Sequence, residues 1–115
     1  MFGRLFGSNN SQERVSTEVT VIEARQLQQQ GAQLIDVRET AEFASGHAVG
    51  AYNIPLGKLA GRPSEIRRDG TVLLICKSGS RSRTAQGLLA RQNVSDVRNV
   101  KGGTSAWRAA KLPME

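Results

Sequence analysis

The sequence predicts an α/β fold: a mostly parallel sheet of about five short strands with helices on both faces. Two observations carry this prediction. From residue 18 onward, short apolar runs alternate with segments of helical periodicity. The run at residues 71–75 is apolar throughout, which is typical of a central strand covered on both faces. The length of 115 residues fits one such domain and not two.

In the first part of the domain, glycine and proline mark the ends of the predicted elements. A helix at residues 22–30 runs into Gly31, which favours helix termination, and Pro55 ends a strand at residues 51–54. The other segments predicted here are a short strand at 19–21, a strand at 33–37, a helix at 39–44, a helical turn at 56–59 and a polar connection at 62–69.

The second part begins with the central strand at residues 71–75 and a polar loop at 76–81. A helix at 82–92 follows, with an apolar face, and then a short strand at 97–100. After a glycine pair, Thr104 is predicted to cap a final helix that runs to Ala110. Residues 1–17 are predicted to be a polar leader outside this domain, which spans residues 18–115.

The charge balance favours anionic ligands or acidic partners. Lys and Arg number 16 against 10 Asp and Glu, a net charge of +6. Aromatic residues make up only 4% of the chain, so we expect no nucleic-acid binding. No apolar run approaches the roughly 18 residues of a membrane span, and a secretory signal is absent. We therefore expect a cytoplasmic protein without membrane contact.

The single cysteine, Cys76, follows the predicted central strand, at the sheet edge where ligands of open α/β folds bind. The next helix begins with N–H groups that lack intrahelical partners and favour an anion. With Lys77 and Arg81 nearby, these effects predict a lowered pKa for the Cys76 thiol and a reactive thiolate. The alternative, an inert core cysteine, does not account for the polar loop that follows it. With one cysteine and one histidine, we expect neither a metal nor a cofactor.

The length of the loop bears on the chemistry. Four residues separate Cys76 from Arg81, one fewer than in cysteine-dependent phosphatases. Gly79 permits the positive φ that a loop around an anion often needs. The tighter ring of N–H groups suits one extra sulfur on the cysteine, a persulfide, better than a phosphoryl group.

Several motifs, in order, resemble those of single-domain rhodaneses, sulfurtransferases of the thiosulfate type. They are the strand motif at residues 34–38, the pair Glu42–Phe43, the segment 45–56 that resembles GHIPGAINIPL, the loop 76–82, and the glycine pair and tryptophan at 102–107. Ala48, Val49 and Tyr52 depart from the family pattern, and none of them lies in the loop. The resemblance covers residues 18–115 and implies a rhodanese fold and sulfurtransferase activity.

By this resemblance, the Cys76 thiolate attacks the outer sulfur of a small anionic donor such as thiosulfate, and sulfite leaves. An acceptor then takes the sulfur: a thiol or a protein in the cell, or cyanide in an assay. The implied residues of the anion-binding loop are Lys77, Ser78, Gly79, Ser80 and Arg81, whose backbone N–H groups hold the persulfide.

Three further residues are implied to support the loop rather than to react: Asp36, Arg38 and Glu42. In the family, Asp36 and Arg38 would brace the active loop and neighbouring segments through hydrogen bonds and ion pairs, with Glu42 as a partner in this bracing. His47 is interpreted as a packing residue, because a preformed thiolate needs no general base. Trp107 is interpreted mainly as a core residue.

Two other functions stay open. A catalytically idle rhodanese-like domain could act as a binding or regulatory module, although such domains usually lose the cysteine or the loop charges. A cysteine-dependent phosphatase or arsenate reductase would use the same thiolate, but the short loop counts against it. We expect the chain to act as a monomer or weak homodimer.

Overall fold

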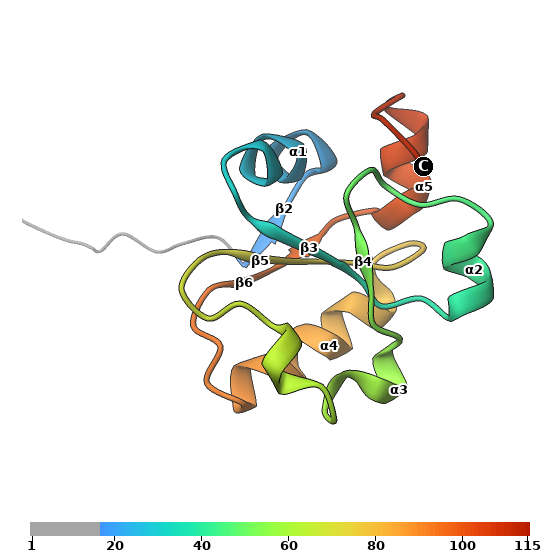
Figure 1. Cartoon of the computed structure of the whole chain (residues 1–115). Coiled ribbons are helices and arrows are strands. Elements are labelled where there is room, and N and C mark those ends of the chain that lie inside the picture. The colour runs from blue at the N-terminus through green and yellow to red at the C-terminus, as the bar shows by residue number, and fades with distance from the viewer. Residues whose placement is uncertain (1–16) are drawn as a thin grey trace, which may run out of the picture.

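The computed structural model describes residues 17–115, which form a five-stranded sheet flanked by helices (Figure 1). The strand order is β2-β6-β5-β3-β4, and every pairing in the sheet is parallel, which confirms the predicted fold class. The elements are β2 (Glu18–Val19), α1 (Val21–Gln29), β3 (Gln33–Asp36), α2 (Thr40–Ala44), β4 (Tyr52–Asn53), α3 (Leu56–Leu59), the 3-10 helix η1 (Pro63–Glu65), β5 (Val72–Ile75), α4 (Ser80–Arg91), β6 (Val97–Val100) and α5 (Gly103–Ala109). Apart from Thr17, the predicted leader lies outside the described residues.

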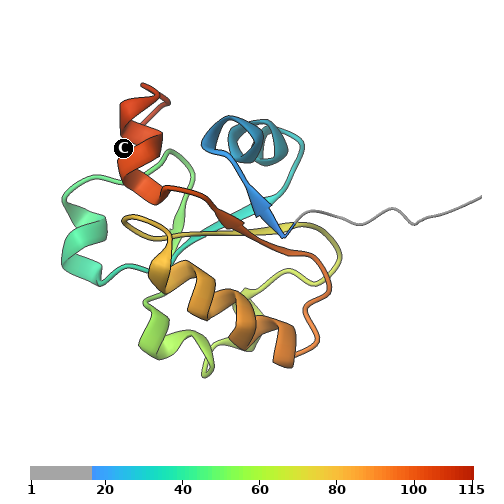
Figure 2. The ribbon, with the colours of Figure 1, turned by 180° about the vertical axis from the view of Figure 1, so that it is seen from behind.

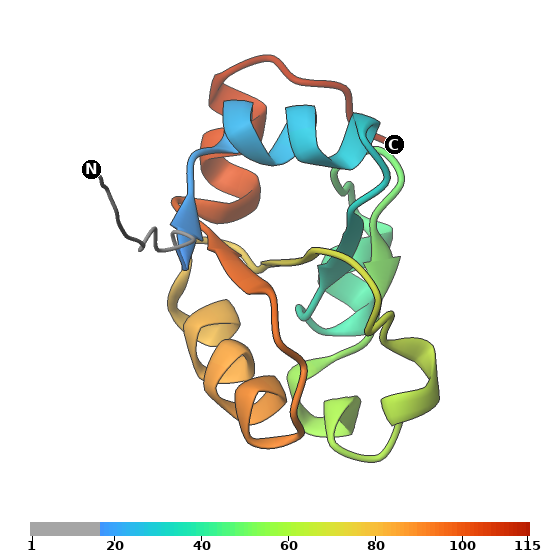
Figure 3. The ribbon, with the colours of Figure 1, turned by 90° about the vertical axis from the view of Figure 1, so that its left-hand side faces the viewer.

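Helices enclose the sheet on both faces. Figure 3 shows α1 and α5 on one side of the strands and α3 and α4 on the other. Figures 1 and 2 both place α2 on the side of the molecule where the loop after β5 turns into α4. The polar segments that follow β3 and β5 therefore meet at the carboxyl edge of the sheet, where open α/β folds place their sites.

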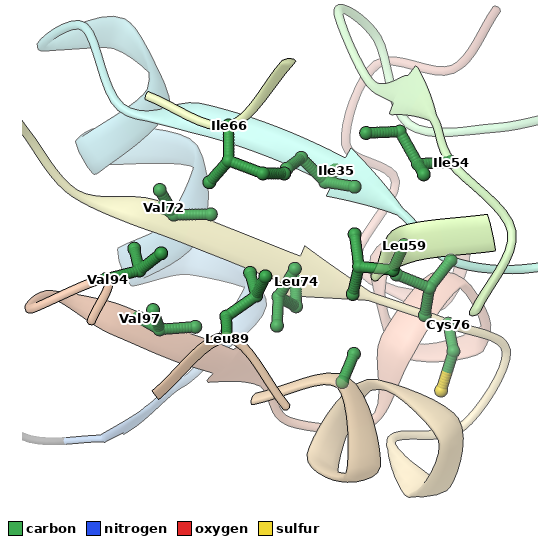
Figure 4. Close-up of a cluster of buried hydrophobic side chains, with 12 residues drawn as sticks. Ile35, Ile54, Leu59, Ile66, Val72, Leu74, Cys76, Leu89, Val94 and Val97 are labelled. Atoms are coloured by element: carbon green, nitrogen blue, oxygen red, sulfur yellow. The ribbon is translucent and has the colours of Figure 1, made fainter. Parts of the chain in front are cut away.

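The central strand β5 has side chains buried on both of its faces. Val72 and Leu74 belong to the cluster on the α3 and α4 side, which Figure 4 shows. Leu73 and Ile75 alternate with them and pack with Trp107 on the α1 and α5 side. This explains why the strand is apolar throughout instead of alternating between apolar and polar residues.

Helix α4 starts at Ser80, two residues before the predicted start at residue 82. Gly79 stands immediately before it with φ of 113°, a conformation that side chains other than glycine's rarely adopt. Because the loop turns this sharply, it is shorter than expected. Arg81 therefore belongs to the first turn of the helix and not to the loop.

The predicted cap of the last helix is wrong. Gly102, with φ of 79°, precedes the first helical residue, Gly103, so Thr104 lies inside α5. The Thr104 hydroxyl donates to the Cys76 carbonyl oxygen at 3.1 Å instead of capping the helix. Two consecutive glycines with positive φ start the helix earlier than a hydroxyl cap would.

The remaining predicted elements are found with ends that differ by a residue or two. Helix α1, for example, begins one residue earlier than expected because Thr20 caps it. The Thr20 hydroxyl accepts from the Glu23 N–H at 3.1 Å, and the Glu23 carboxylate accepts from the Thr20 N–H at 2.9 Å. Within residues 17–115, no helix combines the length and the apolar character needed to cross a lipid bilayer.

Replacing Trp107 tests how much stability the α1 and α5 side of the core provides. Trp107 is fully buried, and its indole N–H donates to the Pro113 carbonyl at 2.8 Å. We expect Trp107→Ala to lower the free energy of unfolding by about 3–5 kcal/mol. Ile22, 49% exposed on α1, is the control. Ile22→Ala should change the free energy of unfolding by only about 0.5 kcal/mol. Equal shifts of the urea midpoint for the two variants would contradict this account of the core.

Candidate active site

Cys76 follows β5 and continues its alternation of side chains. Two residues beyond Leu74, it belongs to the same cluster on the α3 and α4 side, and Figure 4 places it at the end of that cluster, beyond the strand. Only 1% of the residue is exposed. The strand therefore directs the thiol beneath the loop, toward the first turn of α4.

Polar groups of the loop and of α4 contact the sulfur. The Gly79 N–H donates to Cys76 Sγ at 3.0 Å, and Ser82 Oγ lies 3.3 Å from the same sulfur. Both contacts follow from the turn at Gly79, which points its own N–H inward and places Ser82 in the first turn of the helix. The positive end of the α4 dipole also lies at this turn and favours a negative sulfur.

Opposing effects set the ionisation of the thiol. Burial raises the pKa of Cys76, because it removes the thiolate from water. Hydrogen bonds to the sulfur lower it: those from backbone N–H groups of the loop, and that from the Ser82 hydroxyl when this hydroxyl donates to the sulfur. The hydrogen bonds prevail, and the pKa of Cys76 lies below its ordinary value. The site thus favours the thiolate more than water does around a free cysteine.

The glycine pair holds the loop from behind. A Cβ atom on Gly103 would lie 2.3 Å from the Cys76 carbonyl oxygen and 2.6 Å from the Lys77 carbonyl carbon and oxygen. Because Gly103 has no side chain, the next two N–H groups reach those carbonyls: Thr104 donates to Cys76 O at 2.8 Å and Ser105 to Lys77 O at 3.1 Å. The missing side chain at Gly103 thus lets the last helix pack directly against the main chain of Cys76 and Lys77.

Glu42 on α2 pairs with Arg81 in the first turn of α4. The two Arg81 guanidinium nitrogens donate to the Glu42 carboxylate at 2.6 and 3.0 Å. The hydrogen bond from Arg81 lowers the pKa of Glu42 to about 2. Arg81 therefore joins α4 to α2, and much of its charge is neutralised within the protein.

Asp36 and Arg38 form a buried ion pair at the end of β3, with 2.9 Å between Arg38 Nη2 and Asp36 Oδ2. Arg38 also donates to the Gly46 carbonyl at 2.8 Å, and the Asn53 amide donates to the carbonyls of both residues of the pair. These bonds hold the segment after α2 and strand β4 in place. They support the edge of the site at a distance from the sulfur.

Lys77 and Ser78 are exposed on the loop, and Ser80 is exposed as the first residue of α4. Beside the loop lies a polar pocket of about 210 Å³, lined by Arg38, Glu42, Ser45, Lys77, Thr104, Ser105 and Arg108. Since Asp36 already neutralises Arg38, the charge available to a ligand comes from Lys77 and Arg108. The pocket can therefore receive an anionic group next to the active loop.

Three residues near Cys76 or its pocket were not predicted from the sequence: Ser82, Asn99 and Arg108. Ser82 was detectable, because a helix that starts right after Gly79 places residue 82 in its first turn. Asn99 lies on β6 opposite Leu74, and Arg108 reaches the loop only because α5 packs behind it. Nothing in the local sequence marks these two positions.

His47 and Trp107, which were interpreted from the sequence as packing residues, have packing contacts in the structure. His47 Nδ1 lies 2.8 Å from the Phe43 carbonyl oxygen, and its ring stacks on Phe43 with centroids 3.7 Å apart. Trp107 is fully buried in the core. These contacts agree with structural roles for both side chains.

Comparison with known proteins places this arrangement in a family. A model of the rhodanese-like domain matches residues 20–110. The chain is 33% identical over 87 residues to thiosulfate sulfurtransferase GlpE of Pseudomonas aeruginosa (strain LESB58), covering 76% of this chain and 79% of GlpE. It is 47% identical over 76 residues to YqhL of Bacillus subtilis, covering 66% of this chain and 60% of YqhL.

The fold leads to the same family. The structure of the human single-domain sulfurtransferase TSTD1 superposes with a TM-score of 0.75 at 26% identity, covering 83% of this chain and 97% of the human protein. The chain therefore belongs to the rhodanese-like sulfurtransferase family, and the resemblance read from its motifs is confirmed.

Adding a methyl group at Gly103 tests the contact behind the loop. We expect Gly103→Ala to displace the backbone of Cys76 and Lys77, because the added Cβ would overlap main-chain atoms that no side-chain rotation can move away. The variant should lose thiol reactivity and stability together, as measured by alkylation of the single cysteine and by urea unfolding. Gly57→Ala is the matched control, since a Cβ there meets nothing within 4 Å. Unchanged reactivity in Gly103→Ala would contradict the steric role.

Proposed function

We propose that this protein transfers sulfane sulfur from a small anionic donor, such as thiosulfate, to a thiol through a persulfide on Cys76. The observation that carries the proposal is the loop itself. A thiol with a lowered pKa accepts the Gly79 N–H at 3.0 Å at the start of a helix. Membership of the rhodanese-like family and the activity named for GlpE support the same reaction.

The first step is a displacement at sulfur. The Cys76 thiolate attacks the outer sulfur of thiosulfate, a new S–S bond forms on the cysteine, and the old S–S bond breaks. Its electron pair leaves with sulfite. The terminal persulfide sulfur carries the negative charge, and backbone N–H groups of the loop stabilise it as an oxyanion hole stabilises oxygen.

The second step returns the enzyme to its starting state. A thiolate acceptor, either a small molecule or a protein, attacks the terminal sulfur. The S–S bond to Cys76 breaks, its electron pair returns to the cysteine, and the acceptor leaves as a persulfide. No general base is required if both thiols react as thiolates, in keeping with the packing contacts of His47.

The surroundings of the loop suit a dianionic donor. Lys77 and Arg108 line the pocket beside it, while Arg81 is held by Glu42. We therefore assign attraction of the donor mainly to Lys77 and Arg108, and loop support to Arg81. Because Cys76 is 1% exposed, a slim donor must insert its outer sulfur into the loop.

That burial is also the observation that favours a second candidate function. A rhodanese-like module that binds a partner without transferring sulfur has no need of an accessible thiol. A phosphatase is disfavoured, because the loop has four residues between Cys76 and Arg81. A phosphatase would release phosphate from an ester, and a binding module would form no product, so both can be told apart from a sulfurtransferase.

Incubation with thiosulfate tests the proposal. We expect mass spectrometry to show one added sulfur atom on the protein, absent in Cys76→Ser, and thiocyanate to form when cyanide is the acceptor. The assignment to Cys76 is direct, because the chain has a single cysteine. A folded protein that takes up no sulfur would be a binding module, and phosphate release from an ester without thiocyanate would indicate a phosphatase.

Neutralising the pocket tests how the donor is attracted. We expect Lys77→Gln and Arg108→Gln to raise the KM for thiosulfate several-fold with a smaller effect on kcat, because their charge acts before the sulfur moves. Added salt should raise the KM of the parent protein and narrow the difference from the variants. Arg91→Gln, at the far end of α4, is the matched control. KM values independent of both charge and salt would exclude this role.

A further inference from the structure

Polar side chains form a continuous line of contacts from Cys76 to the partly exposed Glu18 on β2. Ser82 Oγ lies 3.3 Å from Cys76 Sγ and 2.5 Å from Asn99 Oδ1. Asn99 Nδ2 donates to the Glu18 carboxylate at 2.9 Å. Ser82 and Asn99 are both buried, so this line crosses the protein interior.

The register of the sheet builds this line. Asn99 on β6 pairs with Leu74 on β5 and with Glu18 on β2, so these side chains point to the same face. Cys76 follows Leu74 by two residues and also points to that face. The first turn of α4 lies over it and supplies Ser82.

The direction of each hydrogen bond follows from the chemistry of the groups. A carboxylate only accepts, so Asn99 must turn its NH₂ toward Glu18 and its carbonyl oxygen toward Ser82. That oxygen also only accepts, so the Ser82 hydroxyl donates to it. The Gly79 carbonyl at 3.1 Å is a more distant acceptor for the same proton. The Ser82 hydroxyl has a single proton to donate, and Asn99 Oδ1, 2.5 Å from Ser82 Oγ, is its nearest acceptor.

A consequence follows at the nucleophile. While Ser82 donates to Asn99, its oxygen offers Cys76 only lone pairs, which can accept from a thiol S–H but repel a thiolate. Turning the hydroxyl toward the sulfur would bring two lone pairs together at the contact between Ser82 and Asn99. Relieving that repulsion requires the Asn99 amide to turn, which sets its oxygen against the Glu18 carboxylate.

We propose that Asn99, oriented by Glu18, is a positioning residue that draws the Ser82 proton away from Cys76 and so restrains formation of the thiolate. The lowering effect of Ser82 on the pKa of Cys76 is then conditional, while that of the Gly79 N–H is constant. The inference deepens the proposed function, because it concerns the same nucleophile. It does not require sulfur transfer, since it concerns only where one proton lies.

The charges around both ends of the line are consistent with an ionised Glu18 that accepts from Asn99. Hydrogen bonds from Asn99 and Arg83 lower the pKa of Glu18, which is therefore ionised at neutral pH, and Lys101 acts in the same direction. At the other end, Arg81 and Lys77 are the cations closest in sequence to the loop sulfur. None of these cations is changed in the variants below.

Glu18→Gln is the first test. A glutamine can donate to the Asn99 oxygen, so the amide can turn and the Ser82 proton can move to the sulfur. We expect the thiolate-to-thiol ratio, measured by ultraviolet absorption at a fixed pH near the titration midpoint, to rise about tenfold, as one hydrogen bond to a charged group predicts. Cys76→Ser supplies the blank. An unchanged or lower ratio in a folded variant would overturn the proposal.

Ser82→Ala distinguishes a relay, in which Glu18 acts on Cys76 through Asn99 and Ser82, from a direct effect of removing the Glu18 charge. In the parent protein, losing the Ser82 hydroxyl should leave the thiolate ratio unchanged or raise it, because that hydroxyl does not donate to the sulfur. In the Ser82→Ala background, Glu18→Gln should have no further effect. A decrease in Ser82→Ala alone, or a Glu18→Gln effect that persists without Ser82, would contradict the relay and indicate direct donation or through-space charge.

Asn99→Leu breaks the line at its centre and provides a second, independent variant. It removes the nearest acceptor of the Ser82 proton, so that the thiolate at 3.3 Å competes for this proton only with the neutral Gly79 carbonyl at 3.1 Å, and it leaves the Glu18 charge in place. We expect a similar rise in the thiolate ratio, with folding checked by circular dichroism. Because thiol titration needs no donor, these results can overturn the relay while sulfur transfer stands, and the reverse also holds.

Discussion

The contact of Gly103 with the main chain of Cys76 and Lys77 is the constraint on which the candidate site depends. The absence of a side chain there lets two N–H groups of α5 reach the carbonyls of the loop. Those bonds fix the chain immediately after the central strand. The turn at Gly79 then directs its N–H to the sulfur. One close approach of backbones thus links the last helix, the sheet and Cys76.

Charged residues around the loop divide into two groups. Arg38 and Arg81 are each paired with a carboxylate, and their contribution is to hold the segment after α2 and the start of α4 in place. Lys77 and Arg108 face the pocket beside the loop. The paired cations thus shape the site, whereas the other two place positive charge on the wall of the pocket. Net charge alone does not reveal this division.

The sulfur itself lies between opposing influences. Burial disfavours the thiolate and backbone N–H groups favour it. The Ser82 hydroxyl can act in either sense, depending on where its proton points. The parallel register that pairs Asn99 with Glu18 extends this third influence to the edge of the sheet. In our proposal, a buried side-chain network thus adjusts a sulfur whose other hydrogen bonds come from the main chain.

Local sequence was sufficient to predict the fold class, the central strand and the position of Cys76 at the end of that strand. Apolar runs and glycines act over a few residues, and a loop between a buried strand and a helix has few possible conformations. The contacts of Glu42 with Arg81 and of Asn99 with Glu18 join residues 39 and 81 positions apart. Such pairs, like the position of Arg108 beside the loop, arise only when helices and strands pack. No local periodicity encodes which distant side chains then come within hydrogen-bonding distance.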